Sequence, residues 1–214
     1  MNMALKIIAV DTSLAVSYSC TAFGYEMEIS QLHDEISTAM FGKKGCMLHW
    51  AKTSKKIKKK AQKKVFDAIE KSKVQFYVFE HKRPAGEEKK SYYLTYIPNN
   101  ISAFINTKLL GRYGTVVVES DRDFEVKGIQ DTTLKFVHNF LSQMCFKLVG
   151  KPVTIRRQED ELRATVKFPN QNRLEFIGRV NESANSKAIQ LADIVLGYKL
   201  NTGKGLEKVF YRKI

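Results

Sequence analysis

Three acidic side chains stand where a carboxylate is unexpected. Asp11 follows the apolar run ALKIIAV (residues 4–10), and Glu119 ends a second apolar run, TVVVE (residues 115–119). Asp193 stands among isoleucine, leucine, alanine and valine in a helix-like segment near the C-terminus. Burying an ionised carboxylate is costly unless a partner compensates its charge. Acids in such places therefore suggest a site at which a cation binds.

The two apolar runs have the character of buried parallel strands, whose carboxyl ends form the edge at which open α/β sheets bind ligands. If they are neighbours, Asp11 and Glu119 lie side by side, with Asp121 two residues further on. A helix packed across that edge would bring Asp193 to them. Gathered carboxylates repel one another, and Mg²⁺ or Mn²⁺ relieves the repulsion while also binding phosphate oxygens. We therefore predict a Mg²⁺ or Mn²⁺ site with Asp11, Asp193, and Glu119 or Asp121 as ligands.

Each acid also has a structural interpretation. An acid after a strand is commonly a turn residue or a helix cap. Glu119 and Asp121 could form an ordinary acidic loop. Helical periodicity places Asp193 about 100° from Ala192, so it can lie at the border of the buried face.

The elements that must position these acids alternate between strand and helix patterns, which predicts an α/β fold with a mixed sheet flanked by helices. Three closely spaced strand-like runs near the N-terminus predict an antiparallel meander. Strands are expected at 4–10, 15–23, 25–30, 74–80, 115–119, 152–158, 162–168 and 173–180, and helices at 31–41, 54–73, 92–114, 129–150 and 185–198. We expect one domain over residues 1–214, with a basic helical segment at about 54–73 and a helical insertion, interrupted at Pro98, at about 92–114.

The charge balance points to a polyanion partner. Lys and Arg number 36 against 22 acids, a formal net charge of +14. Such a field attracts nucleic acid first and an anionic membrane surface second; a lysine-rich protein without such a partner is the alternative. The cations expected to contact backbone phosphates are Lys55, Lys56, Lys59, Lys63, Arg156, Arg157 and Lys187.

The tyrosines of the segment 92–96 bear on the kind of nucleic acid. Tyr92, Tyr93 and Tyr96 could stack on unpaired bases, which favours a single-stranded partner, or could pack into the core.

The remaining composition indicates a cytoplasmic protein. Cys20, Cys46 and Cys145 are widely spaced and odd in number, so no disulfide framework is expected. The N-terminus has no secretory apolar region, and no apolar run approaches the 18 residues or so of a membrane span. Self-association stays open.

Several motifs, taken in order, resemble an uncharacterised family with a ribonuclease-H-like fold. Its members begin with a strand ending in Asp-Glu-Ser-Gly and close with a helix in which Ser-Lys precedes Gln-Leu-Ala-Asp. The matching segments are IIAVDTS (7–13), LHW (48–50), VVVESDR (116–122) and NSKAIQLADIVLGY (185–198). The last is the most specific, because Ser186, Lys187 and residues 190–193 all match.

The resemblance spans roughly residues 5–200 and implies a metal-dependent nuclease core, with Asp11, Glu119 or Asp121, and Asp193 as its acids. The chain departs from the family where DTSL replaces Asp-Glu-Ser-Gly, which removes the second acid and the glycine.

These observations predict a metal-dependent nuclease that hydrolyses phosphodiester bonds by water attack, with single-stranded DNA or RNA favoured and exonuclease action as one form. A non-catalytic nucleic-acid-binding protein on the same fold is the main alternative. A phosphotransferase or phosphatase with a small substrate is a third, although it would not need so large a positive charge.

Overall fold

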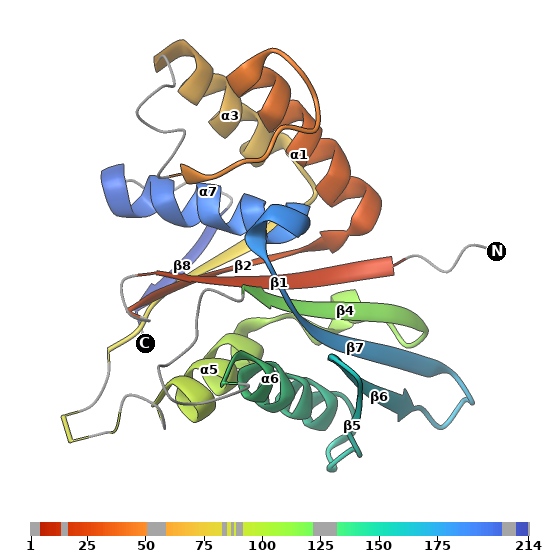
Figure 1. Cartoon of the computed structure of the whole chain (residues 1–214). Helices are drawn as coiled ribbons and strands as arrows, with labels where there is room; N and C mark the ends of the chain where they lie inside the picture. Colours follow the sequence, from red (N-terminus) through yellow and green to blue (C-terminus); the bar gives the residue numbers. More distant parts are fainter. Residues whose placement is uncertain are drawn as a thin grey trace.

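The protein is a mixed sheet covered by helices on both faces (Figure 1). The computed structural model describes residues 5–13, 17–50, 59–82, 85–86, 88, 92–121, 132–202 and 209–213. Helices α1, α3 and α7 lie on one face of the sheet, and α5 and α6 lie on the other. The predicted α/β class is therefore confirmed.

The sheet has eight strands in the order β5-β6-β7-β4-β1-β2-β3-β8. In the centre, β1 pairs antiparallel with β2 and parallel with β4. The strands are β1 (Leu5–Ser13), β2 (Tyr18–Tyr25), β3 (Gln75–Glu80), β4 (Gly114–Asp121), β5 (Arg156–Gln158), β6 (Glu161–Lys167), β7 (Arg173–Asn181) and β8 (Val209–Lys213). The two apolar runs are therefore parallel neighbours, which is the condition on which the predicted acid site depends.

Five α-helices occur in the described residues: α1 (Glu26–Phe41), α3 (Lys59–Lys71), α5 (Ile97–Phe104), α6 (Thr132–Val149) and α7 (Lys187–Thr202). Before and after α5, a π-helical turn (Tyr92–Tyr96) and a 3-10 turn (Thr107–Leu110) complete the helical stretch predicted at 92–114. Within the described ranges, no helix is both long and apolar enough to cross a bilayer.

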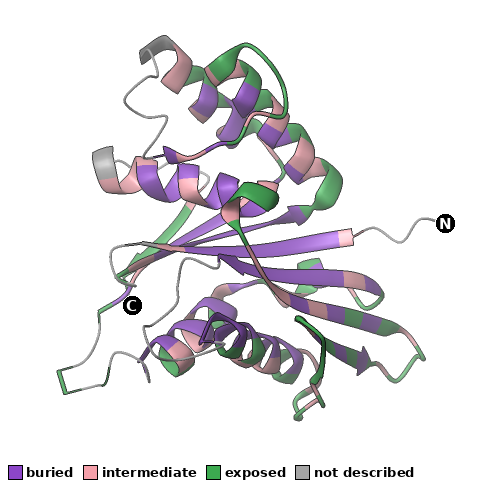
Figure 2. Ribbon diagram, viewed as in Figure 1, coloured by how far each residue is buried: buried purple, intermediate pink, exposed green. Residues whose placement is uncertain are grey.

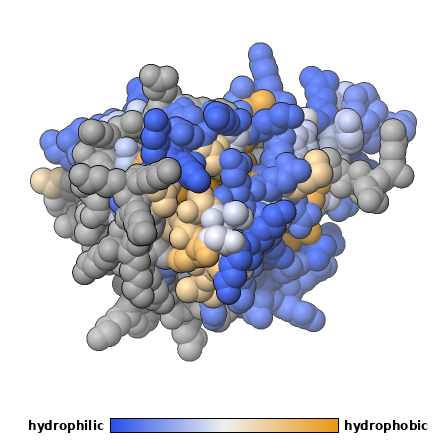
Figure 3. Space-filling view, turned by 90° about the horizontal axis from the view of Figure 1, so that it is seen from above, coloured by the Kyte–Doolittle hydropathy of each residue, from blue (hydrophilic) through white to orange (hydrophobic). Residues whose placement is uncertain are grey.

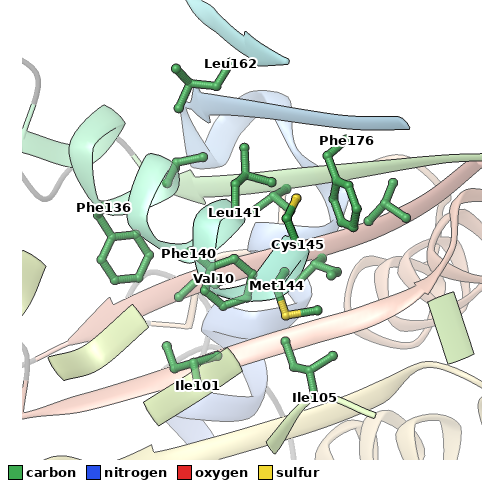
Figure 4. Close-up of a cluster of buried hydrophobic side chains, with 14 of the residues drawn as sticks. Val10, Ile101, Ile105, Phe136, Phe140, Leu141, Met144, Cys145, Leu162 and Phe176 are labelled. Carbon is green, nitrogen blue, oxygen red and sulfur yellow. The ribbon is translucent and has the colours of Figure 1, made fainter. Parts of the chain in front are cut away.

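Two hydrophobic clusters fill the space on the two sides of the sheet (Figure 2). Successive strand residues point to opposite faces, so Ile8 and Val10 of β1 pack toward α6, while Ile7 and Ala9 pack toward α7. Phe136, Phe140, Leu141, Met144 and Cys145 of α6 face the sheet in the first cluster (Figure 4). A strand covered on both faces explains why β1 is apolar throughout its centre.

The prediction for residues 25–30 is wrong, because this segment begins α1 instead of forming a third strand. The backbone N–H of Tyr25 donates to the Glu28 carboxylate at 3.3 Å, and Glu26 and Glu28 lie in the first turn, where acids stabilise a helix. The third strand of the meander is β3, which reaches β2 only after α1 and α3.

The C-terminal strand β8 was not expected from the sequence. It pairs parallel with β3, with Phe76 opposite Val209 and Glu80 opposite Lys213. The Lys213 ammonium and the Tyr211 hydroxyl both donate to the Glu80 carboxylate, at 2.8 and 2.5 Å. All three cysteines are free, as predicted.

Two strand glycines give a matched test of this packing. A Cβ on Gly178 of β7 would meet Leu141 and Val137 of α6 at 2.6 and 2.7 Å, whereas a Cβ on Gly24 of β2 would meet nothing closer than 3.4 Å. Gly178→Ala should lower the free energy of unfolding by about 1–3 kcal/mol through overpacking. Gly24→Ala should leave it unchanged or raise it by up to about 1 kcal/mol. Urea unfolding of both variants checks this, and equal losses would contradict the close β7–α6 contact.

Candidate active site

Asp11 and Asp121 lie side by side where the parallel strands β1 and β4 end. The register pairs Ala9 with Glu119 and Val10 with Ser120, and its next step sets Asp11 beside Asp121. The register also pairs Asp121 with Asn181 of β7. These three residues form a row across adjacent strands, which we call the acid row. Asp11 is only 7% exposed and Asp121 only 8%.

The acid row faces α7. Glu119 points to that helix because its carboxylate accepts a hydrogen bond from the Ser186 hydroxyl at 2.5 Å, immediately before α7 begins. Asp121 is two residues further along β4 and so points to the same face. Asp11 shares its face with Ala9, which packs against α7.

Glu119 lies two residues before Asp121 on β4, and its carboxylate is hydrogen-bonded within the protein. One oxygen accepts from Ser186 and the other accepts two hydrogen bonds from the Arg179 guanidinium, the one from Nε at 3.0 Å. Glu119 is 2% exposed, while the Arg179 side chain is 40% exposed. Of the two β4 acids left open by the sequence, it is Asp121 that lies beside Asp11.

Asp193 of α7 accepts a hydrogen bond from the backbone N–H of Trp50 at 2.7 Å, and His49 Nδ1 lies 3.6 Å from the same oxygen. Burial raises the pKa of Asp193 above its usual range, and the Trp50 hydrogen bond and the His49 charge oppose that rise. Burial, followed by the charges of Asp11 and Asp193, raises the pKa of the Cys20 thiol. Both acids thus act electrostatically on one buried thiol of β2.

The other residues of the SKAIQLAD motif also hold neighbouring segments. The Gln190 amide oxygen accepts from the Leu48 backbone N–H at 2.8 Å and bonds to His33 Nε2 at 2.9 Å. Its amide nitrogen donates to the Ser183 carbonyl at 2.9 Å. The Lys187 ammonium donates to the Ser30 hydroxyl at 3.1 Å and lies 3.4 Å from an Asp34 oxygen.

These contacts show that the motif fastens α7 to β4, to α1 and to residues 48–50. The partners, above all His33 and the backbone of Leu48 and Trp50, were not identified from the sequence. The only sequence signal for a contact between residues 48–50 and α7 was that both segments belong to the series of motifs that resemble the family.

The four predicted acids do not assemble into one compact ligand set in the part of the chain that the structure describes. There, no group of three or more His, Cys, Asp or Glu side chains could hold a metal ion. Asp11 and Asp121 are the two of these acids that end adjacent strands at the same level of the register, with Asn181 paired to Asp121. This set suits Mg²⁺, which is commonly held by one or two carboxylates plus waters and substrate phosphates.

The predicted phosphate-binding cations are dispersed. Lys55 and Lys56 lie outside the described residues, and so does the Lys59 side chain, although its backbone begins α3. Lys63 is exposed on α3, on a face that is mainly hydrophilic in its described part (Figure 3). Arg156 and Arg157 are exposed on β5, at the far end of the molecule from α3 (Figure 1).

The three tyrosines divide between the two expected roles. Tyr92 and Tyr93 are buried in the core, and the Tyr93 ring stacks on Phe136 with the centroids 4.9 Å apart. Tyr96 is exposed and stacks on Tyr92 at 5.6 Å. Of the three, only Tyr96 offers ring surface to solvent.

The hydrogen bond from Trp50 to Asp193 can be tested with two substitutions. Asp193→Ala leaves the Trp50 N–H without its acceptor and should lower the free energy of unfolding by about 1–3 kcal/mol. Asp193→Asn keeps an oxygen acceptor for the Trp50 N–H, so it should lower the free energy of unfolding by less than half as much as Asp193→Ala does. Denaturant unfolding of both variants measures the difference, and equal losses would contradict an acceptor role for Asp193.

The raised pKa of Asp193 predicts a pH effect with a definite sign. The folded state binds this proton more tightly than the unfolded state, in which the pKa is near its usual 3.8. The Asp193 contribution to stability therefore falls as pH rises from below 3.8 through the raised folded value. Relative to Asp193→Asn, which shares the other titrating groups of the protein, the wild type should lose stability as pH rises through this range. A constant difference would contradict the raised pKa.

Comparison of the chain with family models, with curated proteins and with solved structures gave no match. The resemblance to the ribonuclease-H-like family thus remains a prediction from the motifs.

Proposed function

We propose that the protein is a divalent-metal-dependent nuclease that hydrolyses phosphodiester bonds, with single-stranded DNA or RNA favoured. The observation that carries the proposal is the placement of two buried acids, Asp11 and Asp121, each directly after the last paired residue of two adjacent parallel strands. Ligands bind at this edge in open α/β sheets. Two carboxylates held side by side in a poorly solvated place repel each other, and a divalent cation lowers the free energy of the charged pair.

In this proposal Asp11 and Asp121 hold Mg²⁺ or Mn²⁺, and the Asn181 amide oxygen is a further neutral donor in the same row. Such an ion polarises a phosphoryl oxygen and lowers the pKa of bound water. Glu119 and Asp193, predicted from the sequence as ligands, are assigned positioning roles, because both oxygens of Glu119 and one oxygen of Asp193 accept hydrogen bonds that join separate parts of the chain.

Arg179 is the cation best placed to receive a substrate phosphate in this proposal. It lies on β7 beside Glu119 and two residues before Asn181, on the same face as the acid row. Its guanidinium is fixed by the buried Glu119 carboxylate yet is partly exposed. A guanidinium held in this way presents several donors in a fixed geometry, which suits phosphate oxygens.

The arrangement around β1 supports the ribonuclease-H-like part of the proposal. The resemblance implies a first strand that carries an acid and leads into a meander, and a later acid-bearing strand. β1 lies between antiparallel β2 and parallel β4, and the helix with the matching motif packs over both β1 and β4. The net charge of +14 supports a nucleic-acid substrate. A cytoplasmic location belongs to the same proposal.

A second candidate is a nucleic-acid-binding protein without catalysis. The observation that favours it is that Glu119 and Asp193, two of the four acids predicted as ligands, accept hydrogen bonds from within the protein. DTSL in place of Asp-Glu-Ser-Gly also favours it.

A cleavage assay separates the two candidates. Labelled single- and double-stranded DNA and RNA are incubated with Mg²⁺, with Mn²⁺, or with chelator. Wild-type protein should cleave only with metal, and Asp11→Asn and Asp121→Asn should each lower the rate by more than the 10–100-fold or so typical of residues behind the ligands. Asp160→Asn, in the exposed turn between β5 and β6, is the matched control and should retain full activity.

Metal binding gives a readout independent of cleavage. Mn²⁺ at about a hundred times its dissociation constant should stabilise the folded wild type by about 2.7 kcal/mol. Asp121→Asn should lose this gain while Asp160→Asn keeps it. Nucleic-acid binding without cleavage or metal stabilisation in the wild type would reject the nuclease and favour the second candidate.

A further inference from the structure

A basic pocket lies at the opposite edge of the sheet from the acid row. It has a volume of about 850 Å³ and is bounded by the 3-10 turn Thr107–Leu110, the C-terminal end of α6, and the turn between β6 and β7. Five cationic side chains line it: Lys108, Arg112, Lys147, Lys151 and Lys167. The pocket lies beside the amino ends of β4 and β7, whereas the acid row lies at their carboxyl ends.

The charge of this pocket is not neutralised within the described part of the protein. None of its described lining residues is acidic, and none of the five cations forms a salt bridge there. Elsewhere the basic side chains Arg163, Arg179, Lys187 and Lys213 each lie within 4 Å of a carboxylate. The pocket cations therefore repel one another, and an anion from solution would relieve that repulsion.

Lys147 supplies a charge whose position in the pocket lining is fixed by hydrogen bonds. Its ammonium donates to the carbonyl oxygens of Ser102, Ala103 and Ile105, at 3.0, 2.6 and 3.0 Å, where α5 ends. All three of its donors are thereby used. Lys108, Arg112, Lys151 and Lys167 are exposed and can turn their donors toward a ligand.

An aromatic ring lies among these cations. The Arg112 guanidinium stands 5.9 Å from the centroid of the Phe168 ring, and Phe168, Leu148, Val149 and Pro169 give the pocket an apolar portion. A basic groove combined with an aromatic ring is the combination that binds single-stranded nucleic acid, by phosphate contacts and base stacking. A pocket of this size also lies in the range of nucleotide-sized ligands.

We propose that this pocket binds single-stranded nucleic acid, with Lys108, Arg112, Lys151 and Lys167 on the phosphates and Phe168 beside a base. The inference rests on the nucleic-acid partner of the proposed function but not on cleavage. It adds a second contact region, separate from the acid row and from the cations predicted from the sequence.

The test measures the affinity for a fluorescently labelled oligothymidylate of about 15 nucleotides by fluorescence anisotropy, at several salt concentrations. A chelator is present throughout, so that the probe is not cleaved. The pocket variant is Lys108→Gln/Lys151→Gln/Lys167→Gln. The control with the same loss of charge is Lys43→Gln/Lys71→Gln/Lys73→Gln, at three exposed lysines outside the pocket and outside the cations predicted to contact phosphates.

The pocket variant should weaken binding at least tenfold and lower the slope of log affinity against log salt by about 2, since each lost phosphate contact on a single strand contributes about 0.7. The control should change the slope by less than half as much. Phe168→Leu should weaken binding of the oligonucleotide without changing the slope, because stacking releases no counterions.

Equal effects of the two triple variants would overturn the inference, since net charge alone would then explain binding. Binding of inorganic polyphosphate of matched charge as tightly as the oligonucleotide would also overturn it. These outcomes are independent of the nuclease assay: loss of salt-dependent binding in the pocket variant can occur whether or not the wild type cleaves.

Discussion

The polar side chains on the buried side of α7 hold together parts of the chain that are far apart in sequence. Gln190 and Asp193 lie one turn apart and accept the backbone N–H groups of Leu48 and Trp50. Ser186, at the start of the helix, donates to Glu119 of β4. Buried polar groups are tolerable only when their hydrogen bonds are satisfied. The position of α7 over the central strands therefore depends on these particular partners, and so does the surface that it presents to the acid row.

Much of the architecture was predictable because apolar patterns report burial directly. The continuous runs at 4–10 and 115–119 correspond to the two central strands, and their parallel pairing was expected. The exception at 25–30 is informative. The segment YEMEIS alternates as a strand would, but Ile29 and Leu32 continue the helical stripe of α1, and two glutamates stabilise its start. The strand β8 was not predicted, because it forms by pairing with β3, which is far away in the sequence, and the basic C-terminal segment has no strand pattern strong enough to indicate it.

The acids at the ends of the two strands could be predicted from the sequence, but the contacts that each of them makes could not. Sequence alone placed acids at the ends of two strands, but the choice between Glu119 and Asp121 depends on register, and a register is fixed only by the paired backbones. The role of Asp193 depends on the Trp50 N–H, which lies 143 residues away in the sequence. The polar residues of the SKAIQLAD motif thus have a packing role in this protein, because their hydrogen bonds hold α7 in place.

The two edges of the sheet differ in charge, and this difference bears on how a nucleic acid would lie on the protein. The acid row lies at the carboxyl ends of β1 and β4, while five cations surround the pocket beside the amino ends of β4 and β7. A strand of phosphates is attracted to the second edge and repelled by the first unless a cation is bound there. The same separation would allow the basic pocket to hold a strand while metal governs access to the acids. In that arrangement the pocket cations would contribute to affinity, while the acid row, with Arg179 beside it, would govern cleavage.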